Sequence, residues 1–424
     1  MAKRCLIVSY YFPPTGGGGV QRITKWIKYL SRSNWRFTVI TADEQNLLIP
    51  RDESLKTEIP RQTRLVSLKN INPALALKNP AGKPGINKSS YFMRWLSAFF
   101  YLPDMRKNWL AHLKPVLLKE LETNHYDCLL FTIPPYSLAL LAAEMVKLTN
   151  VPVVLDLRDP WSTNPYKIHP TIMHRLVDRR LELRAVAEIP NIISAYRNLL
   201  DYYAENINGF NEKNTALIAN GFDEDDFIQL QAEEQDGAFF NIAFSGTLYS
   251  HLNNPTPLFA AMARLKKKYP DRGSRIRFHH LGKAMIDLKK LARRYSLEEQ
   301  LLEWGYLSHK KALEKLNGMD ALCFILDDAH KNAANTIGGK VYEYLRLKKP
   351  ILALVPREGE AARLIRYTDS GKVISPSDRA FIAKTLGQWQ ENPPHYGFKN
   401  IEDFNRERQA QQLGRFLEQL IPTR

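Results

Sequence analysis

Cysteine is scarce in this chain, which has three among its 424 residues. Cys5, Cys128 and Cys323 each lie in an apolar, strand-like run, and none has the C-x-x-C spacing of a zinc or redox site. Thiols so few and so widely spaced argue against a disulfide framework and against a cysteine-based metal site. We therefore expect all three to be buried core thiols.

Long hydrophobic runs are also missing. The best candidate for a membrane span, LLFTIPPYSLALLAA at 129–143, contains two prolines and is too short to cross a bilayer. The apolar run near the N-terminus is interrupted by Pro13, Pro14 and four glycines, which is not the pattern of a signal peptide. We expect a cytoplasmic protein.

The usual nucleotide-binding signatures are absent as well. The stretch YYFPPTGGGGVQR at 10–22 holds Gly16, Gly17, Gly18 and Gly19 in a row, yet it matches neither G-x-G-x-x-G nor a P-loop. Four glycines are costly in backbone entropy, so the run is either a flexible connector or a loop whose N–H groups approach a phosphate or a sugar. Its place after the first strand of an α/β domain and before a helix favours the second interpretation.

The chain does contain ample apolar residues and an excess of positive charge. Hydrophobic residues make up 44% of it, enough for the cores of two or three domains. The net charge is +16, of which residues 1–200 carry +13. This asymmetry predicts an anionic partner for the first half, such as a nucleotide, a nucleic acid or an acidic membrane surface.

Apolar strand-like runs alternate with helical periodicity, which predicts parallel sheets covered on both faces. The clearest helical patterns span 20–31, 174–188, 256–269 and 340–348. An acidic, polar stretch at 220–238 separates two such series, and we predict that it is an interdomain linker. The expected fold class is α/β, with Rossmann-like domains at 1–222 and 236–400 that bind ligands beyond the carboxyl ends of their strands.

Five motifs, taken in order over residues 5–375, resemble retaining glycosyltransferases of family 4, which have the GT-B fold. They are YYFPPTGGGGVQR (10–22), VVLDLRDPW (153–161), ANGFDEDDF (219–227), FSGTLY (244–249) and GGKVYEYLRLKKPIL (338–352). The resemblance implies two domains facing across a cleft, a nucleotide-sugar donor on the C-terminal domain, and a glycan or lipid-linked acceptor on the N-terminal one. It also implies that no metal or other cofactor is required, and that a C-terminal helix, here 402–420, crosses back onto the first domain.

The second domain supplies the donor-binding candidates. Gly338 and Gly339 begin a helix and permit close approach of a diphosphate, and Lys340 stands in the first turn, where the helix dipole disfavours a cation unless an anion bridges both. Glu343 lies one turn further on and can accept two hydrogen bonds from a ribose diol. The alternative for Lys340 and Glu343 is a solvated helix face.

Two positions depart from the family pattern. The family has a pair of glutamates with seven residues between them; the second falls on Glu343, and the first on Asn335, which carries no charge. Relatives commonly place an arginine beside the glycine that is Gly246 here, but this chain has Thr247. Lys283 is a candidate replacement for that cation, or else a solvent-exposed lysine.

In the first domain, Asp156, Arg158 and Asp159 follow a buried strand. Relatives often have a histidine near the position of Arg158 that contacts the donor sugar. We therefore name Arg158 and Asp159, with Lys340, as candidate catalytic residues. The alternative is an Asp–Arg pair that only pins the loop.

Two apparent metal motifs are discounted. Asp223, Glu224 and Asp225 spell D-x-D, but they follow an Asn-Gly and are better placed to cap the next helix. His279 and His280 are adjacent on a strand, so their side chains point to opposite faces. No metal site is predicted.

Residues 72–119 hold eight Lys and Arg against one acidic residue, interleaved with the aromatic stretch 91–102 and with Trp109. This composition suits the surface of an anionic membrane. A core helix flanked by solvated lysines would have it too, as would a site for single-stranded nucleic acid. Because no nucleic-acid-binding motif accompanies the segment, we expect no nucleic acid partner.

The resemblance implies a metal-independent, hexosyltransferase-type glycosyltransferase, and the lack of a membrane span together with the basic aromatic segment predicts a cytoplasmic protein that is peripheral on the inner face of the membrane. The resemblance places it in the synthesis of bacterial surface polysaccharide, such as lipopolysaccharide, or of lipid-linked glycans. One alternative is a nucleotide-sugar epimerase of the same fold, against which Asn335 argues because an epimerase needs carboxylate acid and base groups at the sugar. Another is a basic nucleic-acid- or membrane-binding protein with a vestigial site.

Overall fold

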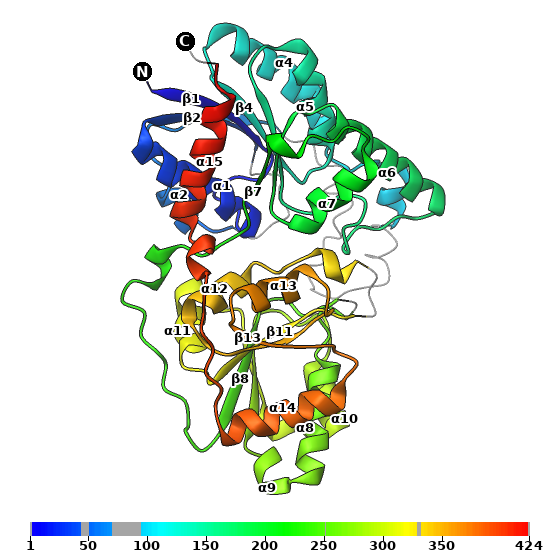
Figure 1. Ribbon diagram of the computed structural model, residues 1–424, viewed down its shortest axis with the longest axis vertical. Coiled ribbons are helices and arrows are strands. Elements are labelled where there is room, and N and C mark those ends of the chain that lie inside the picture. The colour runs from blue at the N-terminus through cyan, green and yellow to red at the C-terminus, as the bar shows by residue number, and fades with distance from the viewer. Residues whose placement is uncertain (1, 44–50, 70–94, 251, 329–331, 423–424) are drawn as a thin grey trace. The chain divides into compact units, whose positions relative to one another are not determined.

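The computed structural model describes residues 2–43, 51–69, 95–250, 252–328 and 332–422 (Figure 1). The chain divides into two compact units. The first contains Met1–Asn220 and Arg406–Arg424, and the second contains Gly221–Asn405. Within the described residues, no helix is both long enough and apolar enough to span a bilayer.

Seven parallel strands form one sheet in the described part of the first unit, in the order β3-β2-β1-β4-β5-β6-β7. Their bounds are β1 Lys3–Ser9, β2 Trp35–Ala42, β3 Arg64–Leu68, β4 Cys128–Ile133, β5 Val153–Leu157, β6 Asn191–Ser194 and β7 Thr215–Leu217. The direction of strand addition reverses between β1 and β4. In open α/β sheets such a reversal opens a crevice at the carboxyl ends of the strands, where ligands bind.

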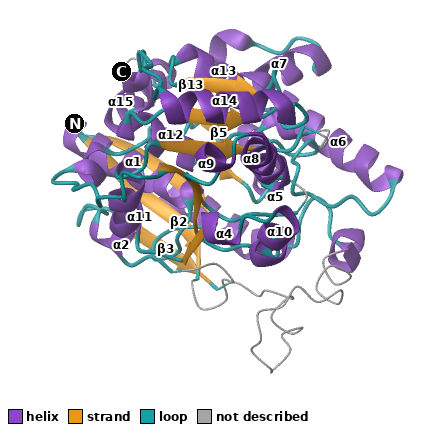
Figure 2. Ribbon diagram, turned by 90° about the horizontal axis from the view of Figure 1, so that it is seen from below, coloured by secondary structure: helices purple, strands orange, loops and turns teal. Residues whose placement is uncertain are grey.

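The helices of this unit flank the strand layer, as Figure 2 shows. Those described are α1 Gly18–Leu30, α2 Ser54–Thr57, α4 Lys107–Thr123, α5 Ser137–Leu148, α6 Ile172–Ala187, α7 Arg197–Asn206 and α15 Arg406–Leu420. The last of them, α15, packs along α1, and the two helices share one hydrophobic core with β1 and β2. Trp26 and Leu30 of α1 meet Leu413 and Leu417 of α15 in that core.

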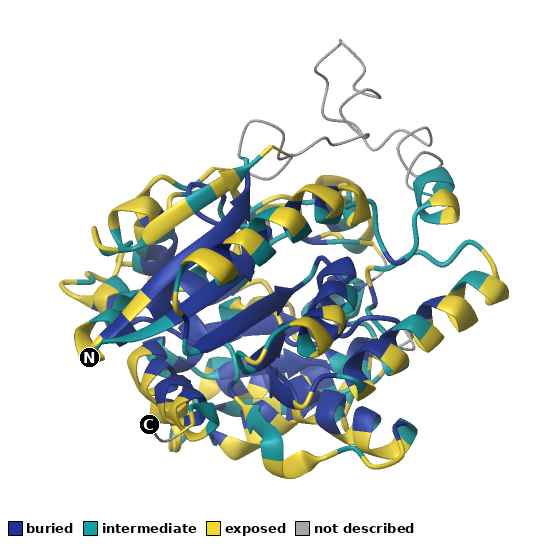
Figure 3. Cartoon of the chain, turned by 90° about the horizontal axis from the view of Figure 1, so that it is seen from above, coloured by how far each residue is buried: buried dark blue, intermediate teal, exposed yellow. Residues whose placement is uncertain are grey.

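The described part of the second unit holds a six-stranded parallel sheet in the order β10-β9-β8-β11-β12-β13. Its strands are β8 Phe240–Ser245, β9 Ile276–Leu281, β10 Leu301–Gly305, β11 Ala321–Ile325, β12 Ile351–Leu354 and β13 Gly371–Ile374. Here the reversal lies between β8 and β11. Most strands of both sheets are buried along their length, as the dark blue arrows of Figure 3 show.

Helices accompany this second sheet as well. They are α8 Thr256–Lys268, α9 Pro270–Gly273, α10 Leu288–Tyr295, α11 His309–Asn317, α12 Lys340–Leu347, α13 Glu360–Tyr367 and α14 Arg379–Glu391. The core of the unit gathers apolar residues of the strands with those of α8, α10 and α14.

The alternation of strands and helices matches the α/β class predicted from the sequence. Each helix predicted from periodicity is present with its ends shifted by no more than two residues: 18–30, 172–187, 256–268 and 340–347 are observed. The three cysteines are buried and form no disulfide, as expected.

The boundary between the units falls between Asn220 and Gly221, at the start of the predicted linker 220–238. Residues from Gly221 onward belong to the second unit, because Glu224 forms an ion pair with Arg346 of α12 and Glu233 forms one with Lys315 of α11. The C-terminal helix begins later than predicted. Residues Ile401–Phe404 form a separate 3-10 turn in the second unit, and α15 starts at Arg406.

We expect Leu417→Ala to destabilise the first unit by about 2–5 kcal/mol, because it leaves a cavity in the core between α1 and α15. Gln411→Ala, at an exposed position of the same helix, is the matched control and should change stability by no more than about 0.5 kcal/mol. Urea unfolding of the whole chain measures both. Equal stability of the two variants would contradict the docking of α15 on α1.

Candidate functional site

The glycine run of the first unit lies at the sheet reversal, between the end of β1 and the start of α1. Gly17 is the N-cap of α1 and has φ 114°, a conformation that favours glycine. Its carbonyl accepts from the N–H groups of Val20 and Gln21, and no side chain caps the helix. Of the first turn, the N–H groups of Gly18 and Gly19 therefore remain available to a ligand at this helix start.

Arg158 lies directly beneath this loop. Its Nε donates to the carbonyl of Ile133 at 3.1 Å, and its Nη2 donates to that of Pro134 at 2.6 Å. A Cβ on Gly19 would lie 1.8 Å from Nη1 of Arg158, so any other residue would displace the guanidinium from this position. Asp159 beside it is half-buried, and burial raises the pKa of Asp159 against the opposing charge of Arg158. A fixed cation next to free main-chain N–H groups suits an anionic ligand.

A buried ion pair supports the loop, and the sequence analysis missed its cation. Arg22 on α1 places Nη2 2.9 Å from Oδ1 of Asp156 on β5, and both side chains are fully buried. Asp156 also accepts from Thr132 Oγ1 at 2.8 Å, and Arg22 donates to the carbonyl of Ala219 at 2.8 Å. Asp156 is thus paired with Arg22, and Arg158 is bound by carbonyls instead. The available signal was that Arg22 precedes Trp26 by four residues on the apolar face of the helix, where a charge needs a partner.

A hollow of about 390 Å³ lies near the same strand ends, at the loops that follow β4 and β5. Aromatic rings from three segments line it, namely Tyr101, Tyr136 and Tyr166. Lys167, also in its lining, forms an ion pair with Asp178 at 2.6 Å and stands 4.7 Å from the ring centre of Tyr136. The hollow combines flat apolar surfaces with a few polar groups, which is typical of small-molecule sites.

In the second unit, two loops at the sheet reversal are held close together by glycines. Gly246 follows β8 and Gly282 follows β9, with φ values of 137° and 136°. A Cβ on Gly282 would lie 2.3 Å from the carbonyl oxygen of Gly246. The Gly246 N–H donates to Leu281 at 2.8 Å, and the Leu248 N–H donates to the carbonyl of Lys283 at 2.9 Å.

Helix α12 meets this edge of the sheet with its first turn. Val341, Tyr344 and Leu345 are fully buried, as the helical pattern predicted. The hydroxyl of Tyr344 accepts from the N–H of Ser245 at 2.7 Å, which ties the helix to the end of β8. Gly339 caps the helix start with no side-chain cap.

Glu343 is the centre of a charged cluster on this helix. Lys340 Nζ lies 2.9 and 3.0 Å from the two oxygens of its carboxylate, and His309 Nε2 of α11 lies 3.1 Å from Oε1. The Glu343 side chain is only 11% exposed, so it does not belong to a solvated helix face, whereas Lys340 is 37% exposed and reaches the surface. His309 was not among the sequence candidates, because its contact with Glu343 depends on how α11 and α12 pack.

The three groups shift one another's protonation. Burial alone would raise the pKa of Glu343, but the Lys340 ammonium and the hydrogen bond from His309 outweigh it and lower the pKa to about 2. Burial alone would lower the pKa of His309, but the Glu343 carboxylate outweighs it and raises the pKa of the imidazole above its ordinary value. Glu343 is therefore a carboxylate throughout the physiological range, able to accept hydrogen bonds.

The other donor-side candidates lie on neighbouring loops. Gly338 is exposed, as is Lys283, for whose side chain no contact is recorded among the described residues. Thr247 is half-buried, and its carbonyl accepts from Asn253. Asn335 ends the 3-10 turn Ala333–Asn335, which packs against the start of α13. The structure brings Lys340 and Glu343 into contact, but it does not join Lys283 or Asn335 to them.

The sequence did not predict a polar hollow of about 610 Å³ at the carboxyl edge of the second sheet. It lies where β11, β12 and β13 end, and its lining residues are Asp328, Pro356, Arg357, Ser375, Ser377 and Asp378. Asp328 accepts a hydrogen bond from Ser375 Oγ. These residue types are common in loops, and only the parallel order of the strands gathers them.

The two discounted metal motifs have other partners. Asp223 caps the turn Glu224–Phe227 by accepting from the Asp225 N–H. His279 meets Asn241 at 3.0 Å, whereas His280 meets the carbonyl of Gly246 at 3.1 Å. No three His, Cys, Asp or Glu side chains converge in a metal-binding group within the ranges that the structure describes.

The basic aromatic segment 72–119 is described only from residue 95 onward. Its residues 72–94, among them Lys83, Lys88 and Arg94, lie outside the described residues. Trp109 is not available to a membrane, because it is 2% exposed and packs edge-on against Tyr10 at 5.1 Å.

Comparison with known proteins rests on structure. No family model and no curated protein matches the sequence. Among solved structures, HepE from Anabaena, described in complex with UDP, has a TM-score of 0.63 at 15% identity, covering 98% of this chain and 100% of its own. Sucrose-phosphate synthase from Thermosynechococcus elongatus has a TM-score of 0.65 at 13% identity, covering 99% of both chains. A glycosyltransferase from Rickettsia africae has a TM-score of 0.61 at 15% identity, covering 100% of both.

This chain has the GT-B fold. Two parallel-sheet α/β units that align with these proteins over nearly their full length show it, as the sequence resemblance implied. At identities of 13–15%, the likeness concerns the fold alone.

We expect Gly19→Ala to lower the free energy of unfolding by about 2 kcal/mol, because the new Cβ displaces the Arg158 guanidinium from its carbonyl partners. Gly18→Ala is the matched control. Nothing lies within 4 Å of a Cβ at Gly18, so alanine there should be neutral or stabilise α1 by about 0.4–1 kcal/mol. Denaturant unfolding measures both, and a Gly19→Ala variant as stable as Gly18→Ala would refute the placement of Arg158.

We expect the second unit to lose stability as the pH rises through the pKa of His309. The folded pKa lies above the ordinary value of 6.5, so the stabilisation is complete below about pH 6 and disappears at higher pH. NMR titration of the His309 ring, with unfolding measured at about pH 6 and pH 9, tests this. In Glu343→Gln the ring should titrate at lower pH; an unchanged titration would show that the pair does not form.

Proposed function

We propose that this chain is a glycosyltransferase that transfers a sugar from a nucleotide sugar to a hydroxyl acceptor, with retention of configuration. The observation that carries the proposal is the Glu343–Lys340 pair at the glycine-led start of α12, set on a GT-B fold. Neighbouring structures support a nucleotide diphosphate as part of the donor. HepE is described with UDP, and a trehalose-6-phosphate protein from E. coli is described with UDP-2-fluoro glucose.

In the proposed mechanism, the second unit stabilises the leaving diphosphate. The N–H groups at the start of α12 and the Lys340 ammonium supply positive charge where negative charge grows as the sugar–phosphate bond breaks. Glu343 holds Lys340 and accepts hydrogen bonds from the ribose, and Asn335 binds a sugar hydroxyl as a neutral partner. The acceptor attacks from the face that the phosphate leaves, and its proton passes to the phosphate. Because Lys340 and the helix start supply the charge, the proposal requires no metal.

We assign the acceptor to the first unit. The loop Gly16–Gly19 with Arg158 and Asp159 would hold its charged or reacting end, and the tyrosine-lined hollow near β4 and β5 would take a sugar ring. A glycan or lipid-linked acceptor suits such a site. WaaB, a lipopolysaccharide outer core galactosyltransferase with a TM-score of 0.59 at 13% identity, supports surface-glycan synthesis as the setting.

The test is incubation of the whole chain with radiolabelled UDP-glucose, UDP-galactose or UDP-N-acetylglucosamine. Transfer releases UDP and moves the label to an acceptor or to water, whereas an epimerase would interconvert the sugars without releasing UDP. We expect UDP release from at least one donor. The proposal would be refuted if no UDP is released from any of these donors and none of them stabilises the chain against thermal unfolding.

Variants on α12 separate binding from chemistry. We expect Lys340→Ala to lower kcat more than it raises KM, because the ammonium meets charge that develops in the transition state. Glu343→Gln should instead weaken UDP binding, by about 1.5–3 kcal/mol in calorimetry, because a charged acceptor is lost. Lys311→Ala, an exposed lysine on α11, is the control and should behave as wild type. If Glu343→Gln binds UDP as tightly as wild type, the ribose assignment is wrong.

A further inference from the structure

Helix α6 turns its acidic side chains inward. Asp178 is fully buried and accepts from Trp161 Nε1 at 2.8 Å, while Lys167 Nζ and His169 Nε2 lie 2.6 and 2.8 Å from its Oδ2. Glu182, one turn later, accepts from the Ser162 N–H at 3.1 Å and from the Tyr203 hydroxyl at 2.8 Å. The helix is thus anchored to the first unit by carboxylates, and its outer face is left to other residues.

That outer face is apolar in its first half. Ile172 and Met173 are 69% and 65% exposed, and Leu176 and Val177 are also exposed. Phe100, 65% exposed, extends the apolar surface from the adjoining helical segment 95–100. That segment is tied to α6 because His174 Nε2 lies 3.1 Å from the carbonyl of Phe99 and the two rings are 4.7 Å apart.

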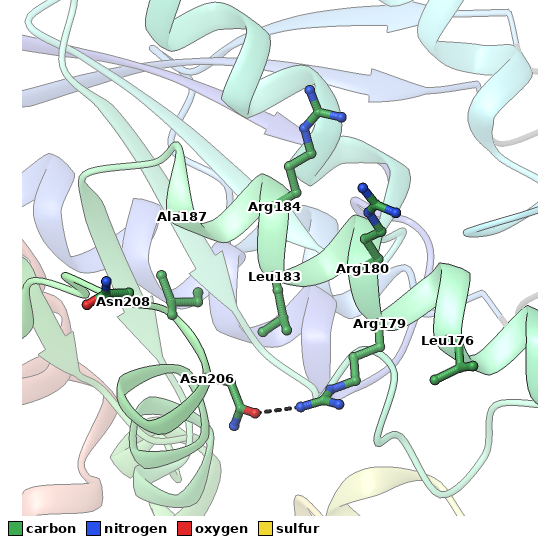
Figure 4. A pocket seen from close by; sticks show the side chains of 9 residues that line it. Leu176, Arg179, Arg180, Leu183, Arg184, Ala187, Asn206 and Asn208 are labelled. Atoms are coloured by element: carbon green, nitrogen blue, oxygen red, sulfur yellow. Dashed lines mark hydrogen bonds between the residues drawn. The ribbon is translucent and has the colours of Figure 1, made fainter.

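The second half of the helix carries arginines on its surface. In Figure 4, Leu176 and Leu183 lie on the side from which Arg179 turns to Asn206, whereas Arg180 and Arg184 extend to the other side of α6. They line an open hollow of about 570 Å³. The two acidic residues within α6, Asp178 and Glu182, are both buried, and Glu188 at its C-cap pairs with Lys147 at 2.7 Å and lies 4.0 Å from Arg184 Nε. We call Phe99, Phe100, Ile172, Met173, Leu176, Val177, Arg180 and Arg184 the α6 face.

From this geometry we infer that the α6 face docks the chain on an anionic lipid bilayer. The large apolar side chains suit the apolar boundary of a bilayer, and the neighbouring arginines suit its anionic headgroups. The apolar half would enter the boundary between headgroups and acyl chains, and the arginines would lie among the lipid phosphates. Apolar side chains gathered on one face mark an interaction site on a soluble unit.

The inference rests on α6, shares only Phe99 and Phe100 with the basic aromatic segment 72–119, and does not depend on the proposed transferase activity. Binding to vesicles is measured without any nucleotide sugar. Loss of transfer with vesicle binding intact would refute only the proposed function, and loss of vesicle binding with transfer intact would refute only the docking surface.

The test is co-sedimentation of the whole chain with phosphatidylcholine vesicles that contain either no phosphatidylglycerol or about 30% of it. We expect binding to the anionic vesicles and little to the neutral ones. Arg180→Ala and Arg184→Ala should each weaken binding about fivefold at low salt. The double variant Met173→Ser/Leu176→Ser should weaken it roughly tenfold or more while leaving thermal unfolding unchanged.

Matched controls are Leu148→Ser and Arg61→Ala, which alter an exposed leucine and an exposed arginine elsewhere on the first unit. Both should bind as wild type does. The inference would be overturned if the α6-face variants sediment with the vesicles as much as the controls do. It would also be overturned if the chain binds neither the anionic nor the neutral vesicles. If the chain does not bind vesicles, and light scattering shows a dimer that Met173→Ser/Leu176→Ser dissociates, the surface binds a second copy of the chain instead.

Discussion

The site of the first unit depends on one buried ion pair, Arg22 with Asp156. Removing both charges from water costs several kcal/mol per ion, and this is offset only where each group finds further partners. Arg22 also reaches the carbonyl of Ala219, and Asp156 also accepts from Thr132. Losing either partner would cost about 3–5 kcal/mol, since the other would stay buried and charged. Arg22 stands one turn inside α1 and Asp156 two residues before Arg158, so the pair sets how the glycine run meets the Arg158 guanidinium.

Buried carboxylates organise the other functional elements in the same way. Glu343 forms ion pairs with Lys340 at the start of α12 and with His309 of α11. The carboxylate thereby holds the Lys340 ammonium at a helix start whose dipole would otherwise repel it. Asp178 and Glu182 anchor α6 from within, which leaves its outer face free to carry Ile172 and Met173. In each case a negative charge inside the fold determines which cations or apolar side chains face outward.

How much of this could be predicted follows from the range of the forces involved. The strands and helices were predictable because apolar runs and 3.6-residue periodicity are local, and the ends of α1 and α12 lie within two residues of expectation. The inward positions of Val341, Tyr344 and Leu345 followed from the same pattern. The pairing of Asp156 with Arg22 spans 134 residues, and the approach of His309 to Glu343 depends on helix packing, so neither was found. The sequence located the start of the predicted linker near the unit boundary but not its contacts, because acidic composition does not show that Glu224 and Glu233 pair with Arg346 and Lys315.

The glycines at positions 17, 18 and 19 are required for different physical reasons. Gly17 is needed for its conformation, because φ 114° strains any side chain. Gly19 is needed for space, because Arg158 occupies the position of its Cβ. Gly18 has neither reason: it is exposed, its φ is not left-handed, and nothing lies within 4 Å of a Cβ placed there. The entropy that Gly18 costs the fold is therefore not explained by the protein's own packing. A ligand that must approach the main chain at the start of α1 would explain it, and the fixed positive charge of Arg158 below the loop makes an anion the ligand that fits.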